Sequence, residues 1–398
     1  MPERTVVVGA SLGGLRAAEG LRAGGYDGHL VLVGAETHPP YDRPPLSKQV
    51  LLGKVTPDAT ALPVADSLEV EWVLGSPAAG LSLADGRLLL EDGRSMGFDR
   101  LVIATGASPR LLPAVPAGPG VHYLRTLDDA AALRADLESS AGLVVIGAGF
   151  IGLEVGCSAQ QLGVPVVVVE ALPVPLERAL GPEMGALILD WHRSKGLDVR
   201  TGAAVRGLRL SHGRPEAVLL ADGSELPADT VVVGVGVAPA TGWLAGSGVD
   251  VADGVLADPH LRVLSAGTPL SNVVAVGDVV RWHHRSYGET VRVEHWTHAA
   301  ESGEAAARAL LHGTAAPAYD PVPYFWSDQH GVKIQVVGRI SAGDEVVLLE
   351  GSLDDDRVVY AFGRDGRLTA ALGVRRPARV MALQRAIAEG APFPPAEG

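Results

Sequence analysis

The chain has 398 residues, 47% of them hydrophobic, and a formal net charge of −13 at pH 7. The length predicts two or three domains, the apolar content excludes a disordered chain, and the charge has the wrong sign for a nucleic-acid binder. The single cysteine, Cys157, excludes an intrachain disulfide, a CxxC redox pair and a cysteine-ligated iron–sulfur cluster. It lies among apolar residues of a predicted helix, where a buried and unreactive thiol is expected.

No stretch of the sequence has the length and apolar character of a membrane-spanning helix. The apolar runs, of which Val164–Val169 and Val231–Val235 are examples, are far shorter than the roughly 20 residues that a bilayer requires. Met1-Pro2-Glu3-Arg4 leads directly into a predicted strand, so no signal peptide is expected. These features together predict a cytoplasmic protein.

A strand, a glycine turn, a helix, a second strand and an acid follow one another near the amino terminus. Thr5–Val8 and Leu30–Val33 are apolar runs typical of buried parallel strands, and Glu36 follows the second of them. Such a turn lets the backbone approach a pyrophosphate, the helix start attracts its charge, and the acid can bind a ribose. The turn contains Gly9, Ser11, Gly13 and Gly14.

This first motif also has a plainer interpretation as an ordinary βαβ unit. Ser11 stands where the middle glycine of the dinucleotide fingerprint is expected. The spacing from Gly9 to Glu36 is 36 − 9 = 27, longer than the usual ~20. The motif alone therefore leaves both interpretations open.

A loop with four prolines follows, and it is expected to be stiff and extended. Its Arg43 and Lys48 could place two cations against a bound ligand, or could simply be solvated. Residues 69–95 predict hairpins with Asp-Gly turns, and Leu101–Ala104 predicts another buried strand. The proline- and glycine-rich segment 109–120 indicates a crossing between domains.

The same order of elements returns in the middle of the chain. Leu143–Ile146 and Val166–Val169 predict two parallel strands, and Glu170 follows the second strand at a spacing of 170 − 147 = 23 from the first glycine. The turn is a complete GxGxxG formed by Gly147, Gly149 and Gly152.

Two such units in one chain predict two dinucleotide sites, one for a tightly held redox cofactor and one for an exchangeable nicotinamide. Glu170 favours NADH over NADPH, because a carboxylate accepts a hydrogen bond from the ribose 2′-hydroxyl and repels a 2′-phosphate. No arginine follows Glu170 immediately, since Arg178 is 178 − 170 = 8 residues further on.

Two later strands are predicted to end in turns that could meet a ligand. Val231–Val235 leads to Gly236, which could admit a ligand ring or merely close a turn. Val273–Val276 is followed by Asp278, an acid at the carboxyl end of a strand, where ligands of doubly wound sheets bind. The run Ala299–Leu311 predicts an amphipathic helix with a partial positive charge at its start.

Residues 324–398 are too few for another nucleotide domain, and they predict an antiparallel sheet followed by a helix at Pro377–Ala388. The adjacent His283 and His284 lack carboxylate or cysteine support, so no metal site is expected there or elsewhere. The predicted strands are Val332–Val337, Glu345–Leu349 and Arg357–Phe362. A cluster of arginines could dock an acidic partner or form a solvated helix face; it consists of Arg375, Arg376, Arg379 and Arg385.

Six segments are specific enough to compare with known families: PYDRPPLSK (40–48), ATGASPR (104–110), VVIGAGFIGLE (144–154), VAVGDV (274–279), EHWTHA (294–299) and PYFWSDQHG (323–331). With them, the chain resembles the ferredoxin-reductase family of FAD/NADH oxidoreductases over essentially its whole length. The resemblance implies an α/β fold with two Rossmann-like domains in a glutathione-reductase-like arrangement and a small α+β C-terminal domain. The implied domains are FAD-binding at 1–112 and 243–316, NAD-binding at 113–242, and C-terminal at 317–398.

The resemblance also implies the residues that hold each cofactor. FAD would be bound by Gly9, Ser11, Gly14, Glu36, Arg43, Lys48, Thr105, Gly106, Arg110, Asp278, Glu294, His295 and Trp296. NAD would be bound by Gly147, Gly149, Phe150, Ile151, Gly152, Glu154, Glu170, Arg178 and Gly236.

Three residues would serve the chemistry itself. The resemblance implies that Lys48 lies beside the flavin, that Glu154 pairs with this lysine, and that Trp326 packs near the ring. A first-turn helix carboxylate and a core tryptophan are the plainer interpretations of the last two. His298 and Ser302 depart from the asparagine and glutamine usual in the family at these positions, and the effect of this departure is open.

Family chemistry implies an FAD-dependent NADH:ferredoxin oxidoreductase. Hydride would pass from NADH to FAD, and single electrons from FAD to a [2Fe-2S] ferredoxin that serves a cytochrome P450 or a Rieske-type oxygenase. The partner could dock near Arg375, Arg376 and Arg379. Two alternatives remain: an FAD/NADH enzyme with a small-molecule acceptor, and a nicotinamide-sensing flavoprotein with little turnover.

Overall fold

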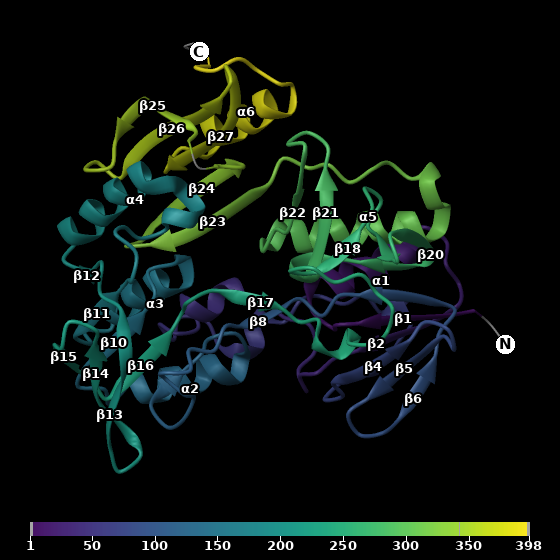
Figure 1. The fold of residues 1–398 in the computed structure, drawn as a ribbon, viewed down its shortest axis with the longest axis horizontal. Helices are drawn as coiled ribbons and strands as arrows, with labels where there is room; N and C mark the ends of the chain where they lie inside the picture. Colours follow the sequence, from purple (N-terminus) through teal and green to yellow (C-terminus); the bar gives the residue numbers. More distant parts are fainter. Residues whose placement is uncertain (1–2, 342, 396–398) are drawn as a thin grey trace. The chain divides into compact units, whose positions relative to one another are not determined.

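The computed structural model describes residues 3–341 and 343–395 (Figure 1). The helices and strands gather in two compact units, each assembled from three separate segments of the chain. The first unit comprises the segment up to Asp42, Ala61–Ser108 and Ala238–Pro323. The second unit comprises Arg43–Thr60, Pro109–Val237 and the segment from Tyr324 onward.

The first unit is built on a sheet of nine strands in the order β22-β21-β18-β19-β20-β7-β1-β2-β3. Strand β1 lies between β2 and β7, is parallel to both, and has its valines almost entirely buried. Burial on both faces explains the unbroken apolar run that predicts this strand. The bounds are β1 Arg4–Val8, β2 His29–Val33, β3 Val70–Val73, β7 Arg100–Ile103, β18 Val255–Ala257, β19 Arg262–Ser265, β20 Thr268–Ala275, β21 Val280–His284 and β22 Glu289–Val291.

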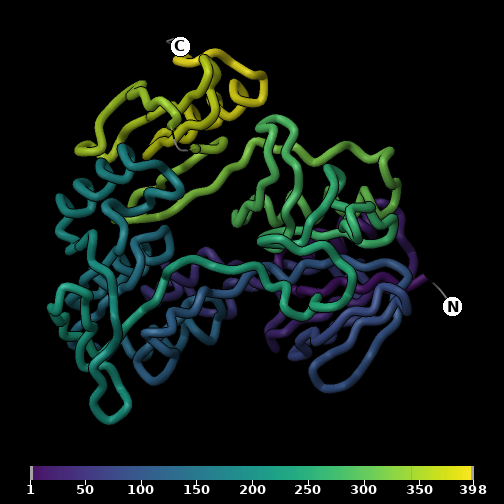
Figure 2. The backbone as a smooth tube through the Cα atoms, viewed as in Figure 1, coloured from purple at the N-terminus to yellow at the C-terminus, as the bar shows by residue number. Residues whose placement is uncertain are grey.

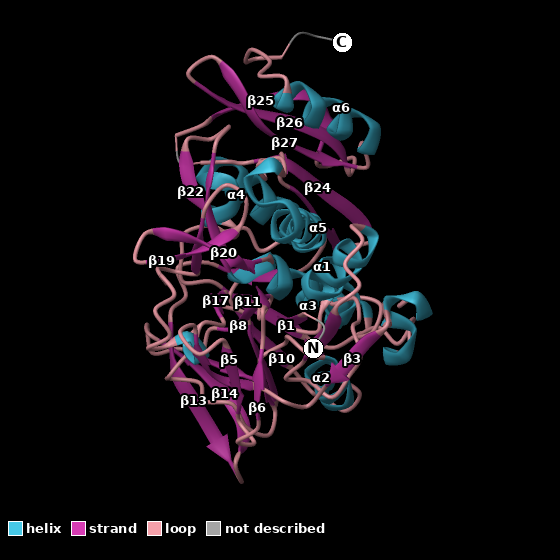
Figure 3. Ribbon diagram, turned by 90° about the vertical axis from the view of Figure 1, so that its right-hand side faces the viewer, coloured by secondary structure: helices cyan, strands magenta, loops and turns pink. Residues whose placement is uncertain are grey.

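Helices α1 (Leu12–Ala23) and α5 (Trp296–His312) pack against each other in this unit. Figure 2 shows them as a purple and a green segment side by side, and Figure 3 shows the same pair from another direction. The absence of side chains allows the close approach, because a Cβ added to Gly303 would lie 2.6 Å from the carbonyl oxygen of Gly13. The helix predicted at Ala299–Leu311 is confirmed, and it begins earlier, at its tryptophan.

The second unit contains a parallel sheet with the strand order β12-β11-β10-β16-β9. Strand β10 (Leu143–Ile146) lies between β11 (Val166–Val169) and β16 (Thr230–Val233), with the bounds predicted for the first two. Both flanking strands are parallel to β10, as a βαβ unit requires. The remaining strands and the helices are β9 Val121–His122, β12 Asp198–Arg200, α2 Leu127–Leu137, α3 Phe150–Gln161 and α4 Glu177–Ser194.

The C-terminal segment belongs to the second unit and forms an antiparallel sheet in the order β23-β24-β27-β26-β25. The three predicted strands and the predicted helix α6 (Pro377–Ala388) are present. Two further strands, β23 (Tyr324–Gln329) and β27 (Arg367–Val374), escape the sequence analysis because neither has a clean apolar alternation. The other strands are β24 Val332–Gly338, β25 Glu345–Ser352 and β26 Arg357–Arg364.

Short elements complete both units. The hairpins predicted in residues 69–95 are confirmed in part, as a small antiparallel sheet of β4 to β6. Two connecting strands, β8 and β17, pair with each other. Strands β13 to β15 form another small antiparallel sheet. The bounds of all these short strands are β4 Ala78–Ser82, β5 Arg87–Leu90, β6 Ser95–Gly97, β8 Ala107–Pro109, β13 Val205–Ser211, β14 Arg214–Leu220, β15 Glu225–Pro227 and β17 Val237–Pro239. The 3₁₀ helices are η1 Pro44–Ser47, η2 Pro57–Thr60, η3 Asp66–Leu68, η4 Gly242–Leu244, η5 Gly277–Val279 and η6 Gly313–Ala315.

The proline-rich loop is not extended throughout, so this expectation is wrong at its end. Pro44 and Pro45 open the 3₁₀ helix η1, which places Lys48 directly after its last turn. Proline has a backbone φ suited to the first helical position and loses no hydrogen bond there. The sequence pattern of prolines therefore indicates stiffness correctly but not the shape of the loop.

None of the helices among residues 3–341 and 343–395 combines the length and apolarity needed to cross a membrane. The division into two units differs in kind from the three predicted domains, because it groups the C-terminal segment with the middle of the chain. The two compact units do not show where a cofactor-binding domain begins and ends, so the domain boundaries at 112, 242 and 316 stay predictions.

Candidate functional site: two glycine cradles and a buried ion pair

The first glycine turn is held tightly between strand and helix. Gly9 has a φ of +122°, and a Cβ added to it would lie 2.1 Å from the carbonyl oxygen of Ala104. A Cβ on Gly14 would lie 1.9 Å from the carbonyl oxygen of Gly9. Ser11 caps α1 without a side-chain hydrogen bond, so the first N–H groups of the helix are left for a ligand. The cradle fits a pyrophosphate.

The second glycine turn repeats this geometry. Gly147 has a φ of +103°, and its added Cβ would lie 2.4 Å from the carbonyl oxygen of Gly234. A Cβ on Gly152 would lie 2.1 Å from the carbonyl oxygen of Gly147. Gly149 is the N-cap of α3 and has its nearest such neighbour at 3.9 Å, so this position stays open to a ligand. This cradle also fits a dinucleotide pyrophosphate.

The acids at the strand ends are held differently in the two units. The hydroxyl of Tyr41 donates a 2.5 Å hydrogen bond to Glu36 Oε2. The carboxylate of Glu170 accepts from two backbone N–H groups, those of Ala148 at 2.8 Å and Leu172 at 2.9 Å. Glu170 therefore braces its own glycine turn while its remaining lone pairs can accept from a ribose.

In the first unit, the turn that carries Asp278 is clamped by two residues of α5. Ser302 Oγ accepts a hydrogen bond from the Gly277 N–H at 3.0 Å, and His298 Nε2 lies 3.3 Å from the Gly277 carbonyl oxygen. Sequence analysis left the effect of His298 and Ser302 open, and the structure shows that they satisfy both backbone groups of this glycine. The helix itself begins at Trp296, whose Nε1 donates to Asp42 Oδ1 at 2.8 Å.

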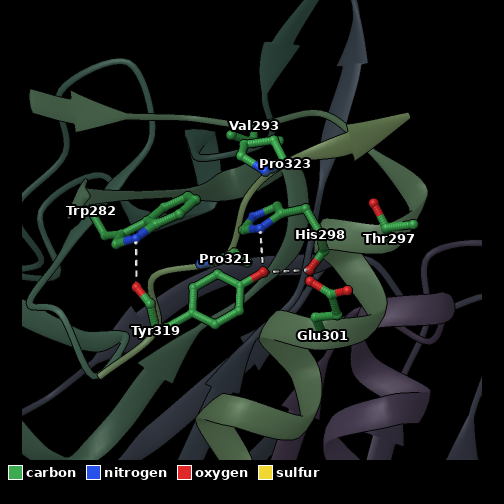
Figure 4. Close-up of a pocket in the computed structure, with 8 residues that line it drawn as sticks. All are labelled: Trp282, Val293, Thr297, His298, Glu301, Tyr319, Pro321 and Pro323. Atoms are coloured by element: carbon green, nitrogen blue, oxygen red, sulfur yellow. Dashed lines mark hydrogen bonds between the residues drawn. The ribbon is translucent and has the colours of Figure 1, made fainter. Parts of the chain in front are cut away.

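His298 also forms the wall of a small pocket in the first unit (Figure 4). Its ring stacks on Trp282 with centroids 4.8 Å apart, and its Nδ1 lies 2.9 Å from the hydroxyl of Tyr319. Burial lowers the pKa of His298 to about 4, so the imidazole is neutral near pH 7. The other residues around the pocket are Val293, Thr297, Glu301, Pro321 and Pro323.

A buried ion pair lies in the second unit. Lys48 Nζ is 2.8 Å from Glu154 Oε1, and the two side chains are 9% and 5% exposed. The hydroxyls of Ser47 and Ser327 each donate to this carboxylate at 2.5 Å. The predicted pairing of Lys48 with Glu154 is thus present, and charges this deeply buried require such partners.

Three aromatic residues lie on β23, and one of them meets the first residue of α3. Phe150 meets Phe325 edge to face at 4.9 Å. Trp326 packs beside Tyr324 at 6.0 Å, and Lys333 Nζ lies 5.1 Å from its ring centre. The structure therefore places Trp326 one residue from Ser327 on β23, and its role near a flavin stays a prediction.

The other predicted site residues are distributed over both units. Thr105 Oγ1 donates to the Ala240 carbonyl oxygen at 2.8 Å, and Arg43 Nη1 donates to that of Arg125 at 2.6 Å. The first unit carries the predicted FAD residues Gly9, Ser11, Gly14, Glu36, Thr105, Gly106, Asp278, Glu294, His295 and Trp296. The second unit carries Arg43, Lys48 and Arg110, together with the predicted NAD residues Gly147, Gly149, Phe150, Ile151, Gly152, Glu154, Glu170, Arg178 and Gly236.

Sequence reasoning missed the two serines on Glu154 and the clamp on Gly277. Ser47 lies in PYDRPPLSK and Ser327 in PYFWSDQHG, two of the segments that carry the family resemblance. Membership in these segments was the sequence signal that could have pointed to the two serines. Hydroxyl contacts between residues more than 100 positions apart cannot be read from local pattern. The clamp on Gly277 likewise depends on how α5 packs.

The geometry of two glycine cradles agrees with what comparison with known proteins finds. Residues 3–303 match the family "Pyridine nucleotide-disulphide oxidoreductase", and residues 324–397 match "Reductase C-terminal". The chain belongs to the pyridine nucleotide-disulphide oxidoreductase family. As a member with only Cys157, it has no cysteine pair of its own for a disulphide.

Relatives of this family member align over nearly its full length. It is 35% identical to putidaredoxin reductase CamA of Pseudomonas putida, covering 99% of this chain and 93% of that protein. It is 36% identical to rhodocoxin reductase of Rhodococcus erythropolis, with 98% and 90% covered. The reductase in the crystal structure of the covalent putidaredoxin reductase–putidaredoxin complex matches with a TM-score of 0.92 at 34% identity, covering 98% and 94%. The predicted family resemblance and fold class are confirmed.

Proposed function

We propose that this chain is an FAD-dependent NADH:ferredoxin oxidoreductase. The observation that carries the proposal is the pair of glycine cradles, one in each unit, in a chain whose full-length relatives are named as reductases of putidaredoxin and rhodocoxin. Electrons would go to a [2Fe-2S] ferredoxin that serves a cytochrome P450 or a Rieske-type oxygenase. Bound FAD supplies the chemistry, since it accepts a hydride from NADH and releases electrons singly.

The first cradle would hold FAD, within a domain formed by 1–112 and 243–316. Its free helix N–H groups would bind the pyrophosphate, and Glu36 would accept from the adenosine ribose. Asp278, on the turn clamped by α5, would accept from the ribityl hydroxyls. Arg43, Thr105, Gly106, Arg110, Glu294, His295 and Trp296 would complete this site.

The second cradle would hold NADH, within a domain formed by 113–242. Glu170 carries the preference for NADH, because its carboxylate repels the 2′-phosphate of NADPH. Arg178, at the start of α4, is exposed to solvent. Phe150, Ile151 and Gly236 would border the nicotinamide half, and 317–398 would form the C-terminal domain.

The buried pair would serve the flavin electrostatically. Lys48 holds a positive charge that Glu154 and its two serine donors keep in one position. A fixed cation in a site that excludes water stabilises negative charge on a reduced ring far better than a mobile one. Trp326 would shield this site, and no side chain of the chain needs to act as a nucleophile.

The ferredoxin would dock at an arginine patch near α6, formed by Arg375, Arg376 and Arg379. Arg376 Nη2 lies 3.2 Å from Glu350 Oε2, and Arg379 Nε lies 3.8 Å from Glu350 Oε1, so part of the patch charge is already balanced. An acidic ferredoxin would compete with this one acid for two guanidinium groups. We place this reaction in the cytoplasm.

The proposal is tested by stopped-flow reduction of the purified flavoprotein with NADH and with NADPH, followed by candidate ferredoxins and cytochrome c. We expect fast flavin reduction by NADH, slow reduction by NADPH, and cytochrome c reduction that requires ferredoxin. NADH consumption that depends on a small molecule and not on ferredoxin would move the assignment to the small-molecule enzyme. Slow turnover with every acceptor would move it to the sensor.

A further inference from the structure

Three side chains that commonly ligate metals meet in the second unit, apart from both cradles. They are Cys157 on α3, His192 on α4 and His330 in the turn between β23 and β24. One sulfur and two nitrogen atoms from these residues all lie within 4.8 Å of one another. Three elements far apart in sequence thus bring a soft donor and two imidazoles to one point.

The distances resemble those of a zinc site whose ion has been replaced by a hydrogen bond. Cys157 Sγ lies 3.5 Å from His330 Nε2, close to the ~3.6 Å between sulfur and nitrogen ligands of a tetrahedral zinc. His192 Nδ1 lies 2.8 Å from the same nitrogen, whereas two nitrogen ligands would stand ~3.4 Å apart. To admit the ion, the two imidazole nitrogens would have to separate by about half an ångström. Cys157 Sγ and His192 Nδ1, which lie within 4.8 Å of each other, would have to take a separation of ~3.6 Å.

The two imidazoles are ready to bind a metal, whereas the thiol must first lose its proton. Burial, together with the other imidazole, lowers the pKa of His192 to about 3, and burial lowers that of His330 to about 4, so both rings are neutral near pH 7 and each has one nitrogen without a proton. Burial raises the pKa of the Cys157 thiol to about 12, so this group holds its proton until a cation displaces it.

The surroundings of the cluster largely exclude solvent and contain polar groups that can orient a ligating imidazole. Cys157 is 5% exposed and His192 is 0% exposed. His192 Nε2 and Gln329 Oε1 are both buried without a hydrogen bond of good geometry in the described part of the chain, and the Gln329 side chain acts on the pKa of His192. A zinc-bound His192 would donate from Nε2 toward this oxygen. Lys195, whose charge contributes to the lowered pKa of His330, is paired with Asp356 at 2.9 Å.

We propose that Cys157, His192 and His330 bind one zinc ion through Sγ, Nδ1 and Nε2, with a water molecule as the fourth ligand. On binding, the S–H bond breaks, the Zn–S bond forms and this proton leaves to water, while the proton shared in the imidazole–imidazole hydrogen bond moves to the other nitrogen of its own ring. No oxidation state changes. The ion replaces the hydrogen bond between the two imidazoles. Because Cys157 follows Glu154 by one helical turn and His330 follows Ser327 on β23, zinc would fasten both sides of the buried ion pair.

The chain offers a matched control for the ligand in the turn. His330 has a φ of 49° and precedes Gly331, and the exposed His212 has a φ of 50° and precedes Gly213 in the β13–β14 turn. Asparagine tolerates this left-handed conformation, so His330→Asn removes the imidazole at little cost to the turn. His212→Asn makes the same change away from the cluster.

The test is titration of the full-length, EDTA-treated protein with Zn²⁺ by calorimetry, and with Co²⁺ by its visible absorption. We expect one site per chain in the natural protein and in His212→Asn, and at least tenfold weaker binding in His330→Asn and Cys157→Ala. A cysteine–cobalt charge-transfer band should vanish in Cys157→Ala. Absence of a 1:1 site in the natural protein would overturn the proposal. So would equal affinity in His330→Asn, even if Cys157→Ala proved unstable.

Discussion

The two glycine cradles share their packing and differ in how their polar parts are fastened. In both cradles, the first glycine lies too close to the end of a neighbouring strand to carry a Cβ, and the last glycine lies equally close to the carbonyl oxygen of the first glycine. Around the first cradle, side chains secure the turns: the nearby Tyr41 holds Glu36, and Ser302 and His298 of α5 hold Gly277. Around the second, Glu170 braces its own turn through backbone N–H groups.

This difference suits the two proposed ligands. A site that is held by contacts from several parts of the chain is costly to open, because all of these contacts must break at the same time. That property fits a cofactor that stays bound. A turn braced by one local acid can bind and release its ligand while the rest of the fold is unchanged, which fits an exchangeable nicotinamide.

The largest effect is expected from breaking one cradle at a time. Gly14→Ala and Gly152→Ala each drive a Cβ into a carbonyl oxygen, at 1.9 Å and 2.1 Å. We expect Gly14→Ala to purify with little flavin. Gly152→Ala should keep its flavin but be reduced by NADH roughly 100-fold more slowly, a barrier increase of about 3 kcal/mol. Flavin absorbance and stopped-flow rates check both.

The controls for this comparison are glycines in open space. Gly242→Ala in the first unit and Gly118→Ala in the second add a Cβ that meets no heavy atom within 4 Å. Both should behave as the natural protein does. If Gly152→Ala also lost its flavin, the assignment of one ligand to each cradle would be wrong.

The next effect concerns Lys48 and Glu154, which are the only lysine, arginine or acidic residues that are buried in the described part of the chain. Lys48→Met leaves the Glu154 carboxylate buried without its cation, which typically costs about 3–5 kcal/mol. We expect this loss in urea unfolding, and slower flavin reduction. The exposed Lys54, which donates to Gln161 at 3.2 Å, gives the control Lys54→Met with almost no loss.

A double variant decides whether the cost comes from the stranded charge. Lys48→Met/Glu154→Leu removes both ions, so it should recover part of the stability lost in Lys48→Met. Recovery of stability without recovery of the reduction rate would separate the structural from the electrostatic role. Failure to recover stability would mean that the two serines, rather than the lysine, dominate the energetics of Glu154.

A smaller effect should appear as pH dependence in the clamp of the first cradle. His298 has its pKa lowered to about 4 by burial, below about 6.5 in an unfolded chain. The unfolded chain therefore binds more protons between these values, so stability present above pH ~6.5 is lost as pH falls toward ~4, by up to about 3 kcal/mol. The groups that face His298 include the Tyr319 hydroxyl, the Gly277 carbonyl, Glu301 across the pocket and, through their charges when protonated, His284 and His295.

His298→Phe keeps a ring against Trp282 and removes the titration. It should be less stable than the natural protein at pH 7, because hydrogen bonds to Tyr319 and Gly277 are lost. Its stability should also fall less between pH 7 and pH 5, as measured by urea unfolding at both values. An identical pH dependence in the two proteins would assign the effect to other groups.

The sequence predicts local features of both units well. Leu143–Ile146, Val166–Val169 and the helix Pro377–Ala388 have the predicted bounds, because apolar period and proline position act within a few residues. Contacts across the chain are harder. β23 was missed because its FWSD residues face different environments, with only Ser327 and Gln329 fully buried.

The candidate site divides in the same way. Glycine spacing predicts both cradles, because the strand, the turn and the helix can pack this closely only where residues at fixed positions have no side chain. The pairing of Lys48 with Glu154 came from family resemblance, and no local pattern could supply it. The Cys157–His192–His330 cluster was missed altogether, because its members are 35 and 138 positions apart and follow no ligand spacing (192 − 157 = 35, 330 − 192 = 138).

The smallest effect would sharpen the contrast between the two acids. Glu170→Gln removes the charge that repels a 2′-phosphate and keeps one amide oxygen for the Ala148 or Leu172 N–H. We expect the preference for NADH over NADPH in flavin reduction to fall by about tenfold, which corresponds to about 1.4 kcal/mol. Glu36→Gln is the matched change in the first cradle, where Tyr41 is the partner. It should weaken flavin retention and leave the nicotinamide preference where it was. A shift of that preference in Glu36→Gln, or none in Glu170→Gln, would reverse the roles given to the two acids.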